Sequence, residues 1–319
     1  MTSQTLVPAR SYLAGCALVV LAGLALSLGI ICLRGASSSN AWQYLFWRAL
    51  AFSVALFFVA TLRHGTSPLA QIRRLGGFAW LSVGAMTASQ ILFVAAIMSG
   101  STAEVFFLMS LAPLMAAVLA WPMLGERIGA LGVIAIAVAI GGVALMSGFN
   151  LQIDGLHPGL WEEGWLARAL ALGTAVSFAV YSLATRGAKS EDLDAALFAV
   201  GLSTTAVSAT VLLSLGQPLA SSLRDAALAL LHGGIILSAG LVLFARGSRL
   251  VPGVTLVMLA QAETIAAPVW TYLLFNETTT PTVIVGGVLI LFAVLMQASD
   301  GARQQAGSTA VAAAMAPDR

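Results

Sequence analysis

Glu263 is a carboxylic acid inside an apolar stretch that is long enough to cross a membrane. It lies about ten residues into that stretch, which corresponds to a depth of ~14 Å in a helix. A carboxylate at this depth is costly unless it is protonated, paired or exposed to a watery cavity. Because burial favours the protonated form of a carboxyl, Glu263 could couple transport of a ligand to a proton. A neutral glutamic acid that only bonds a neighbouring helix is the alternative interpretation.

Residues near Glu263 in the sequence could complete a ligand site. Gln261 and Thr264 form a polar ridge beside it, and Trp270 offers an aromatic surface for stacking. Alanines about one helical turn away on either side leave room for a ligand. We therefore expect Glu263, Gln261, Thr264 and Trp270 to bind substrate.

Arg48 is the one cation predicted to lie deep in the bilayer, ~10 Å below the outer interface. Its planar guanidinium can bind a carboxylate through two parallel hydrogen bonds, which suits a substrate acid. It could equally extend its long stem outward or pair with an acid of the protein. A binding role and a structural role both remain open for Arg48.

Other polar residues within apolar stretches are weaker candidates. Tyr181 shares a stripe of one helix with Thr174 and Ser177, and such hydroxyl groups in membranes usually serve helix packing. Glu104 lies near the expected outer mouth. The further candidates for substrate binding are Gln90, Tyr181 and Ser110, and the candidates for a gate or mouth are Glu104, Pro113 and Pro268.

Ten apolar stretches must position these residues. The 319-residue chain is 59% hydrophobic and 9% charged, whereas soluble domains contain about 25% charged residues. A membrane-spanning helix needs about 20 apolar residues. The sequence therefore predicts an all-α integral membrane protein with ten transmembrane helices, at residues 12–33, 41–62, 77–98, 103–124, 128–146, 164–185, 195–215, 226–243, 254–275 and 282–298.

Several classes of function lack their signatures in this sequence. It contains no ATPase phosphate-binding loop, no HExxH zinc motif and no nucleophile elbow. Cys16 and Cys32 are too far apart along one helix for a disulfide, and the three histidines are isolated, so we expect them to be solvated near helix ends. Tyr44 is expected in the aromatic belt at the interface. No catalytic residue, metal, cofactor or nucleic-acid partner is predicted, since the net charge is only +2.

The distribution of cations predicts the orientation of the chain. With the N-terminus inside, the inner segments hold 11 of the 15 Arg and Lys residues, and the outer segments hold three. Positive residues concentrate on the cytoplasmic side of membrane proteins. Both termini are therefore expected in the cytoplasm.

The chain contains an internal repeat of five spans. Arg34-Gly-Ala recurs as Arg186-Gly-Ala, an offset of 152 residues, and the segment ending in Gly125-Glu126 aligns with the segment ending in Asn276-Glu277 at an offset of 151. Because five is odd, the second copy must be inserted upside down, as in many secondary transporters. We predict a first repeat at residues 11–147, an outer linker at 148–163, a second, inverted repeat at 164–298 and a disordered cytoplasmic tail at 299–319.

These motifs resemble the EamA-type branch of the drug/metabolite transporter superfamily. The family pattern of Pro followed thirteen residues later by Glu is matched by Pro113 and Glu126, with Gly142 in the next helix, and by Glu277 with Gly286 in the second repeat. Phe46-Trp47-Arg48-Ala49 is similar to an aromatic-Arg element of the family. Thr264 stands where the second repeat often has Pro, so we expect the helix break there to be weaker or shifted to Pro268.

The resemblance implies a secondary transporter of small organic metabolites such as amino acids, an exporter that works by alternating access and is compatible with proton coupling. It implies a multi-pass protein of the bacterial inner membrane, in contact with lipid, as a monomer or a homodimer. Two alternatives remain: facilitated exchange of phosphorylated or nucleotide-linked solutes, and a membrane sensor or enzyme that does not transport. The first needs several deep cations, of which the sequence offers only Arg48.

Overall fold

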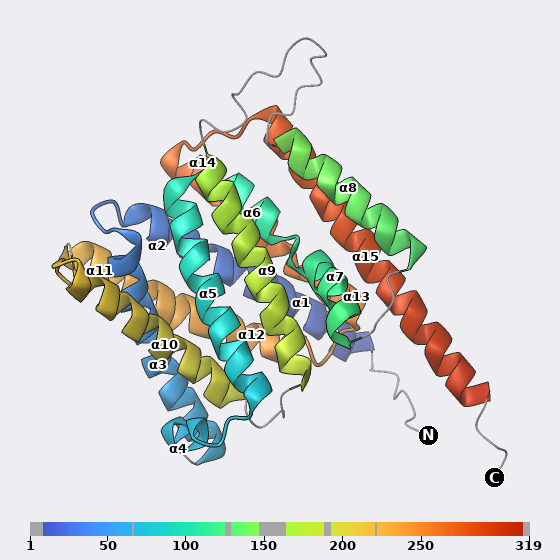
Figure 1. Ribbon diagram of the computed structural model, residues 1–319, viewed down its shortest axis with the longest axis horizontal. Coiled ribbons are helices and arrows are strands. Elements are labelled where there is room, and N and C mark those ends of the chain that lie inside the picture. Colours follow the sequence, from blue (N-terminus) through green and yellow to red (C-terminus); the bar gives the residue numbers. More distant parts are fainter. Residues whose placement is uncertain are drawn as a thin grey trace.

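In the computed structural model the described part of the chain is a bundle of α-helices without strands (Figure 1). It comprises residues 9–65, 67–124, 129–146, 164–187, 193–220 and 222–314. Eight helical segments are long and apolar enough to cross a membrane, and α8 is a shorter apolar helix of 17 residues. The prediction of an all-helical membrane protein is thus confirmed.

The described residues of the first half form eight helices, and those of the second half form seven α-helices and one π-helix. The first eight are α1 (Ala9–Ser27), α2 (Gly29–Gly35), α3 (Ala41–His64), α4 (Pro68–Ile72), α5 (Gly77–Ser99), α6 (Thr102–Met109), α7 (Ala112–Leu124) and α8 (Ala130–Met146). The second half comprises α9 (Trp165–Gly187), α10 (Leu193–Ser214), α11 (Leu223–Leu231), the π-helix η3 (His232–Leu237), α12 (Ser238–Gly247), α13 (Gly253–Ala260), α14 (Ala262–Phe275) and α15 (Pro281–Ala314).

Two apolar segments are interrupted at equivalent points of the two halves. Helix α6 ends before Ser110, and α13 ends before Gln261. Both helices have eight residues, and their starts and ends are offset by 151 residues, the offset found in the sequence repeat. The second break therefore lies at the repeat position and is not shifted to Pro268, which lies inside α14.

Polar side chains at the two breaks donate hydrogen bonds to backbone carbonyl groups that the interrupted helices leave without a partner. The Ser110 hydroxyl donates to the Phe107 carbonyl at 2.6 Å, and Ser110 is buried. The Gln261 amide donates to the Val257 carbonyl at 3.5 Å. Inside a membrane such backbone groups need internal partners. A glutamine can thus accompany a break without a proline at position 264, so the expected shift to Pro268 was wrong. The second break is shorter than the first, since only Gln261 separates α13 from α14 whereas two residues separate α6 from α7, which agrees with the other expectation of a weaker break.

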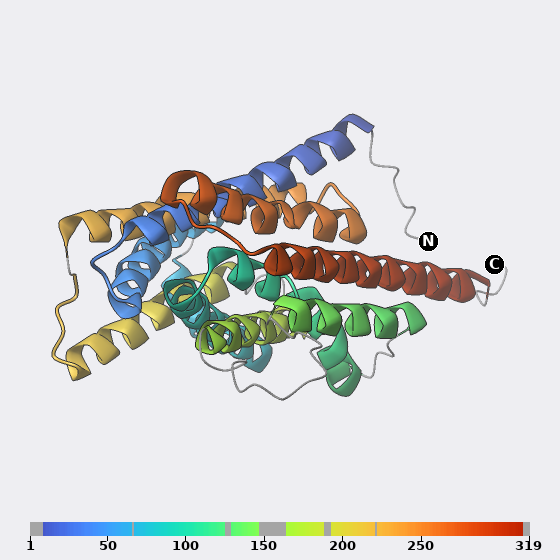
Figure 2. The same cartoon turned by 90° about the horizontal axis from the view of Figure 1, so that it is seen from above.

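Helices of the two halves pack in a reciprocal pattern. Helix α1 packs on α12, α13 and α14, and α9 packs on α5, α6 and α7. The second and seventh segments, α3 and α10, pack together, as do the fifth and tenth, α8 and α15 (Figures 1 and 2). If each segment of the first half is exchanged with its equivalent in the second half, the same set of contacts results. The first helix of each half therefore lies mainly against the other half.

Helices α8 and α15 approach each other most closely at a pair of glycines. A Cβ atom on Gly142 would lie 2.7 Å from the Gly286 carbonyl oxygen, and one on Gly286 would lie 2.6 Å from the Gly142 carbonyl oxygen. Such close backbone contact requires residues without a side chain. The α8–α15 pair forms one side of the molecule (Figure 1).

Connections that follow the odd-numbered spans meet at one end of the molecule, which we call the Glu277 end. Arg34 and Glu277 form an ion pair there, with 3.2 Å between Nη2 and Oε1, and Ser38 donates to Asp225. Asn40, which caps α3, donates to Gln217 at 2.6 Å. The chain therefore crosses the bundle alternately in the two directions, as predicted for antiparallel neighbours. By the distribution of cations, the Glu277 end is expected outside the cell.

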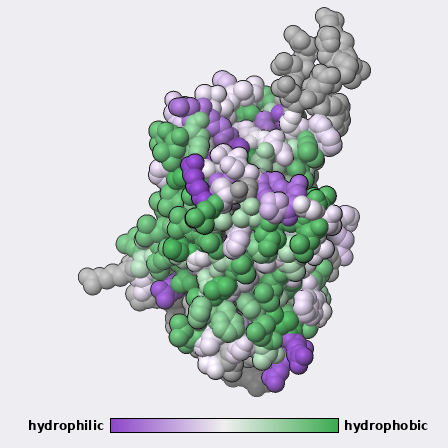
Figure 3. Space-filling view, turned by 90° about the vertical axis from the view of Figure 1, so that its left-hand side faces the viewer, coloured by the Kyte–Doolittle hydropathy of each residue, from purple (hydrophilic) through white to green (hydrophobic). Residues whose placement is uncertain are grey.

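The surface between the two ends is apolar. Hydrophobic side chains cover broad areas of the face in Figure 3, and exposed leucine, valine, isoleucine and phenylalanine residues occur on most long helices. A patch of this size on a soluble protein would be unusual. Helix α15 also continues past the expected end of the last span to Ala314, where we expected a disordered tail from residue 299. Alanine, which favours helix, is frequent in that extension.

Candidate functional site

The centre of the bundle contains Arg48 and Gln90, which the structure brings into direct contact. Arg48 on α3 donates from Nη1 to the Gln90 Oε1 on α5 at 2.6 Å. Both side chains are buried, with Arg48 only 4% exposed. Within the described residues the Nε of Arg48 has no hydrogen-bond partner. A buried guanidinium with an unused donor is suited to bind a further acceptor, because unpaired buried donors are costly.

Glu263 lies in the first turn of α14, directly after the helix break. Helix α1 passes close behind it, since a Cβ atom on Gly23 would lie 3.1 Å from the Glu263 backbone nitrogen. The carboxyl interacts electrostatically with Arg48, yet no ion pair between the two is found among the described residues. The two groups therefore lie near enough to interact but do not form a direct ion pair.

The polar ridge expected beside Glu263 is present. Thr264 donates to the Gln261 Oε1 at 3.3 Å, and Thr264 is buried. Trp270 lies further along α14, where its indole nitrogen donates to Ser27 of α1 at 2.9 Å. Its indole N–H is thus occupied by the protein, while its ring remains partly accessible. The break, Glu263 and Trp270 all lie against α1, which forms one boundary of the candidate site.

The remaining candidates are spread along the bundle. Ser110 closes the break between α6 and α7, and Pro113 lies in the first turn of α7, where its missing N–H costs no helical hydrogen bond. Tyr181 packs its ring on Phe178 within α9 at 5.5 Å between centroids. Pro268 lines a pocket on the side of the bundle. Among the described residues, no hydrogen bond, ion pair or ring contact joins these four to Arg48 or Glu263.

A buried pair next to Arg48 was missed by the sequence reasoning. The Tyr44 hydroxyl and the His232 Nδ1 lie 2.7 Å apart, and the residues are 1% and 5% exposed. Tyr44 was expected in the interfacial belt and His232 near solvent, and both expectations were wrong. Tyr44 lies one helical turn from Arg48 on α3, and this shared face was the one available signal.

The π-helix η3 explains why His232 lies inside the bundle. A Cβ atom on Gly233 would overlap the carbonyl oxygen of Arg48, so no side chain fits at this position. The backbones of α3 and η3 therefore touch at Gly233, and His232 is held between Tyr44 and Gly29. π-Helical turns occur frequently at functional sites. In this bundle, η3 positions the Tyr44–His232 pair beside Arg48.

The Glu277 end carries polar contacts that join the two halves. The Glu277 carboxylate accepts from the backbone N–H and the hydroxyl of Thr102, at 2.5 and 3.0 Å, and pairs with Arg34. A carboxylate at the N-terminus of α6 is favoured by the helix dipole. Asn276, in the left-handed conformation with φ 51°, ends α14 immediately before Glu277. We call Arg34, Thr102 and Glu277 the Glu277 cluster.

A second ion pair at the same end involves a predicted mouth residue. Glu104 of α6 accepts from the Arg168 Nη2 of α9 at 3.1 Å. Both partners are largely buried, with side chains 13% and 22% exposed. Glu104 belongs to the first half and Arg168 to the second, so this pair also links the halves. Glu126, which matches Glu277 in the repeat, lies outside the described residues.

Comparison with known proteins identifies the first half of the chain. Residues 13–148, which extend from α1 to the end of α8, match the model of the EamA-like transporter family. No curated protein matches the chain. A solved structure described only as "Crystal structure of protein" has a similar fold, with 18% sequence identity and a TM-score of 0.54, over 90% of this chain and 96% of the other. Residues 13–148 are therefore similar to the EamA-like transporter family.

Proposed function

We propose that the protein is a secondary transporter for small zwitterionic metabolites such as amino acids. The observation that carries this proposal is the pair of helix breaks at equivalent positions of the two halves, with Glu263 beside one of them. Broken helices at mid-membrane form the substrate sites of many transporters with inverted repeats. The reciprocal packing of the halves supports two inverted five-helix repeats.

The charges of the site favour a substrate that carries both signs. The free Nε of Arg48 can donate to a substrate carboxylate, and the Glu263 carboxylate can accept from an ammonium group. A zwitterion neutralises both groups at once, which a phosphorylated solute does not. The site thus supports amino acids over the phosphorylated or nucleotide-linked solutes of the alternative hypothesis.

In the proposed alternating-access cycle, polar contacts between the two halves keep the Glu277 end closed. The Glu277 cluster and the Glu104–Arg168 pair join the halves at the Glu277 end. This arrangement corresponds to a conformation closed at that end, which we place outside a bacterial inner membrane. Rocking of one half against the other would break these contacts and expose the site there. Export would then proceed from the cytoplasm, with protons entering in exchange.

The first test measures which ligands bind. Purified protein in detergent is heated with free amino acids, with the corresponding decarboxylated amines and with the corresponding 2-oxo acids. We expect a zwitterion to raise the melting temperature, while its amine and its oxo acid, which each lack one charge, do not. A shift by the oxo acid alone would contradict a role of Glu263 in binding the ammonium group.

The second test measures transport. In reconstituted vesicles the amino acid found by melting should move down its gradient, and a pH gradient should accelerate it. We expect Glu263→Gln to abolish the response to the pH gradient, because the amide cannot carry a proton. Glu104→Gln, which removes a carboxylate at the Glu277 end, should retain that response. Absence of flux for every metabolite, with or without a pH gradient, would refute transport.

A further inference from the structure

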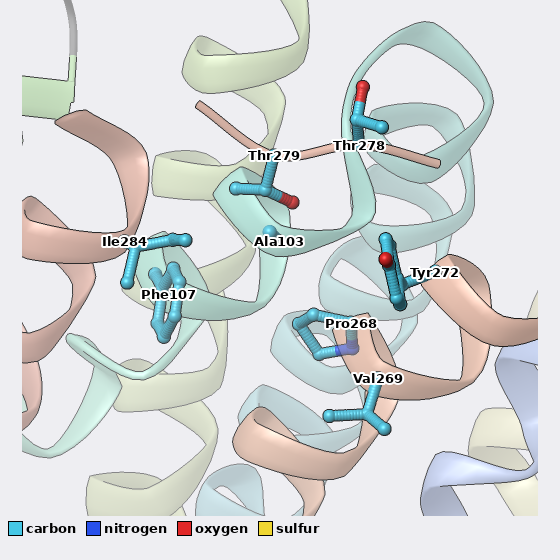
Figure 4. A pocket seen from close by; sticks show the side chains of 8 residues that line it. All are labelled: Ala103, Phe107, Pro268, Val269, Tyr272, Thr278, Thr279 and Ile284. Atoms are coloured by element: carbon cyan, nitrogen blue, oxygen red, sulfur yellow. The ribbon is translucent and has the colours of Figure 1, made fainter. Parts of the chain in front are cut away.

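A pocket of about 350 Å³ lies on the side of the bundle, between the first and second halves of the chain. Its walls are Ala103 and Phe107 of α6, Pro268, Val269 and Tyr272 of α14, and the segment from Thr278 to Ile284 that leads into α15 (Figure 4). This volume is within the range of sites that bind small molecules. The pocket is separate from Arg48 and Glu263.

The pocket opens onto the apolar surface of the bundle. Val269, Tyr272 and Ile284 are each about half exposed, at 47%, 59% and 49%. The neighbouring exposed residues Leu273 and Val285 continue the same apolar surface along α14 and α15. The opening therefore lies on the side of the bundle that a bilayer is expected to cover.

Hydroxyl groups line the pocket at Thr278, Thr279 and Tyr272, whereas the wall at Pro268 and Val269 is apolar (Figure 4). Figure 4 shows Thr278 and Thr279 above the space, Phe107 and Ile284 on one side, Tyr272 on the other, and Pro268 and Val269 below. The threonines follow directly after Glu277, whereas Pro268 lies seven residues before the end of α14, which is ~10 Å deeper in a helix. The polarity of the pocket therefore changes along the expected membrane normal, with hydroxyl groups toward the interface.

We propose that this pocket binds one acyl chain of a bilayer phospholipid, with the ester region of that lipid at Thr278 and Thr279. The apolar walls accommodate the methylene groups, and the hydroxyl groups can donate to ester carbonyls at the interface. An uncharged rim does not select a particular headgroup. The opening toward the hydrocarbon region and the polarity gradient together favour a lipid over a water-soluble ligand.

An acyl chain at this position would contact both halves of the transporter. Ala103 lies between Thr102 and Glu104, which both make polar contacts with the second half. Phe107 packs against α15, since a Cβ atom on Gly287 would overlap the Phe107 ring. A bound chain thus fills the junction directly below the Glu277 cluster and stabilises the closed arrangement of that end.

The proposal is tested by photo-crosslinking to lipid in the absence of substrate, so its outcome is independent of the proposed transport. Full-length protein is reconstituted in vesicles of phosphatidylethanolamine and phosphatidylglycerol that contain a phospholipid with a diazirine on one acyl chain. After irradiation, adducts are mapped by mass spectrometry. We expect saturable adducts on α6 and α14, at the residues that line the pocket.

Two variants fill the pocket and one serves as a control. Ala103→Phe occupies the space from within, and Val269→Trp covers the opening from an exposed position that does not challenge folding. Both should reduce the pocket adducts at least fivefold. Val288→Phe, at a position of α15 that is 57% exposed, should leave them unchanged. Adducts spread evenly over α14 and α15, which neither filling variant alters, would show only the general lipid shell and overturn the proposal.

Discussion

Arg48 is held at the centre of the bundle by a small number of polar contacts. One guanidinium nitrogen donates a hydrogen bond to Gln90, and the backbone carbonyl of Arg48 lies against Gly233 of η3. The chain therefore fixes the position of the guanidinium through both its side chain and its backbone, while Nε stays available. A fixed donor loses little conformational entropy when it binds a ligand, which favours affinity.

Replacement of Arg48 by lysine separates charge from geometry. Arg48→Lys keeps the positive charge but removes the planar arrangement of donors. We expect the affinity for an amino acid substrate to fall about tenfold or more, because hydrogen bonds to charged groups contribute about 1.5–3 kcal/mol. Titration calorimetry in detergent measures this change. Arg246→Lys, at an exposed position of α12, should bind as the unaltered protein does, and equal affinities for both variants would contradict the role of Arg48.

The Tyr44–His232 pair stabilises the bundle beside that site. Tyr44→Phe removes the hydroxyl and leaves a buried ring nitrogen without its partner. We expect the free energy of unfolding in detergent to decrease by about 1–3 kcal/mol. Tyr12→Phe, at a position that is 37% exposed on α1, should change it by much less. If Tyr44→Phe were as stable as Tyr12→Phe, the hydrogen bond would contribute nothing to the fold.

At the scale of helices, the apolar segments could be predicted because a membrane span requires a long run of hydrophobic residues. Depth along such a run was sufficient to select Arg48, Gln90 and Glu263. The rotation of each helix about its axis was not predictable, because a helix surrounded by lipid and protein carries a weak polar–apolar pattern. The contact between Arg48 and Gln90 and the burial of Tyr44 depend on that rotation, so both required the structure.

The contact between α8 and α15 yields opposite expectations for two adjacent glycines. A Cβ atom on Gly142 would collide with the backbone of α15, and this clash cannot be relieved by rotation of a side chain. A Cβ atom on Gly141 would have no atom of a neighbouring element within 4 Å. We expect Gly142→Ala to lower the free energy of unfolding by about 1–3 kcal/mol. Gly141→Ala should raise it by about 0.5–1 kcal/mol, since alanine favours helix. Thermal unfolding in detergent compares the two variants, and the same sign for both would contradict the packing at Gly142.

For the whole molecule, the proposed transport cycle assigns to the polar contacts at the Glu277 end the control of which side of the site is open. Glu277 accepts three hydrogen bonds from the first half, and neutralising it weakens all of them. The population of the conformation open at this end should therefore increase. Rates of exchange between conformations depend on the same contacts, because they break when the halves separate.

Accessibility of the break in α6–α7 reports this population. Cysteine is introduced as Ser110→Cys after Cys16 and Cys32 have been replaced by alanine, and the protein is reconstituted in vesicles. We expect Glu277→Gln to accelerate labelling by an impermeant maleimide, added at the side that the Glu277 end faces, several-fold. Arg224→Gln, which removes an exposed charge from α11 at the same end, should leave the rate unchanged. Equal rates in both variants would contradict a gating role of the Glu277 cluster.

The reciprocal packing of α1 and α9 has a consequence for biosynthesis. Helix α1 leaves the ribosome before the other described helices, and most of them are made before its main partners α12, α13 and α14. Helix α5 likewise waits for α9, whose contact surface contains the buried alanines 171, 175 and 179. Insertion into the bilayer can proceed helix by helix, whereas packing of the core has to follow the completion of the chain. Until then the small-residue surfaces of the first half remain uncovered, which makes the unfinished chain a substrate for membrane chaperones and proteases.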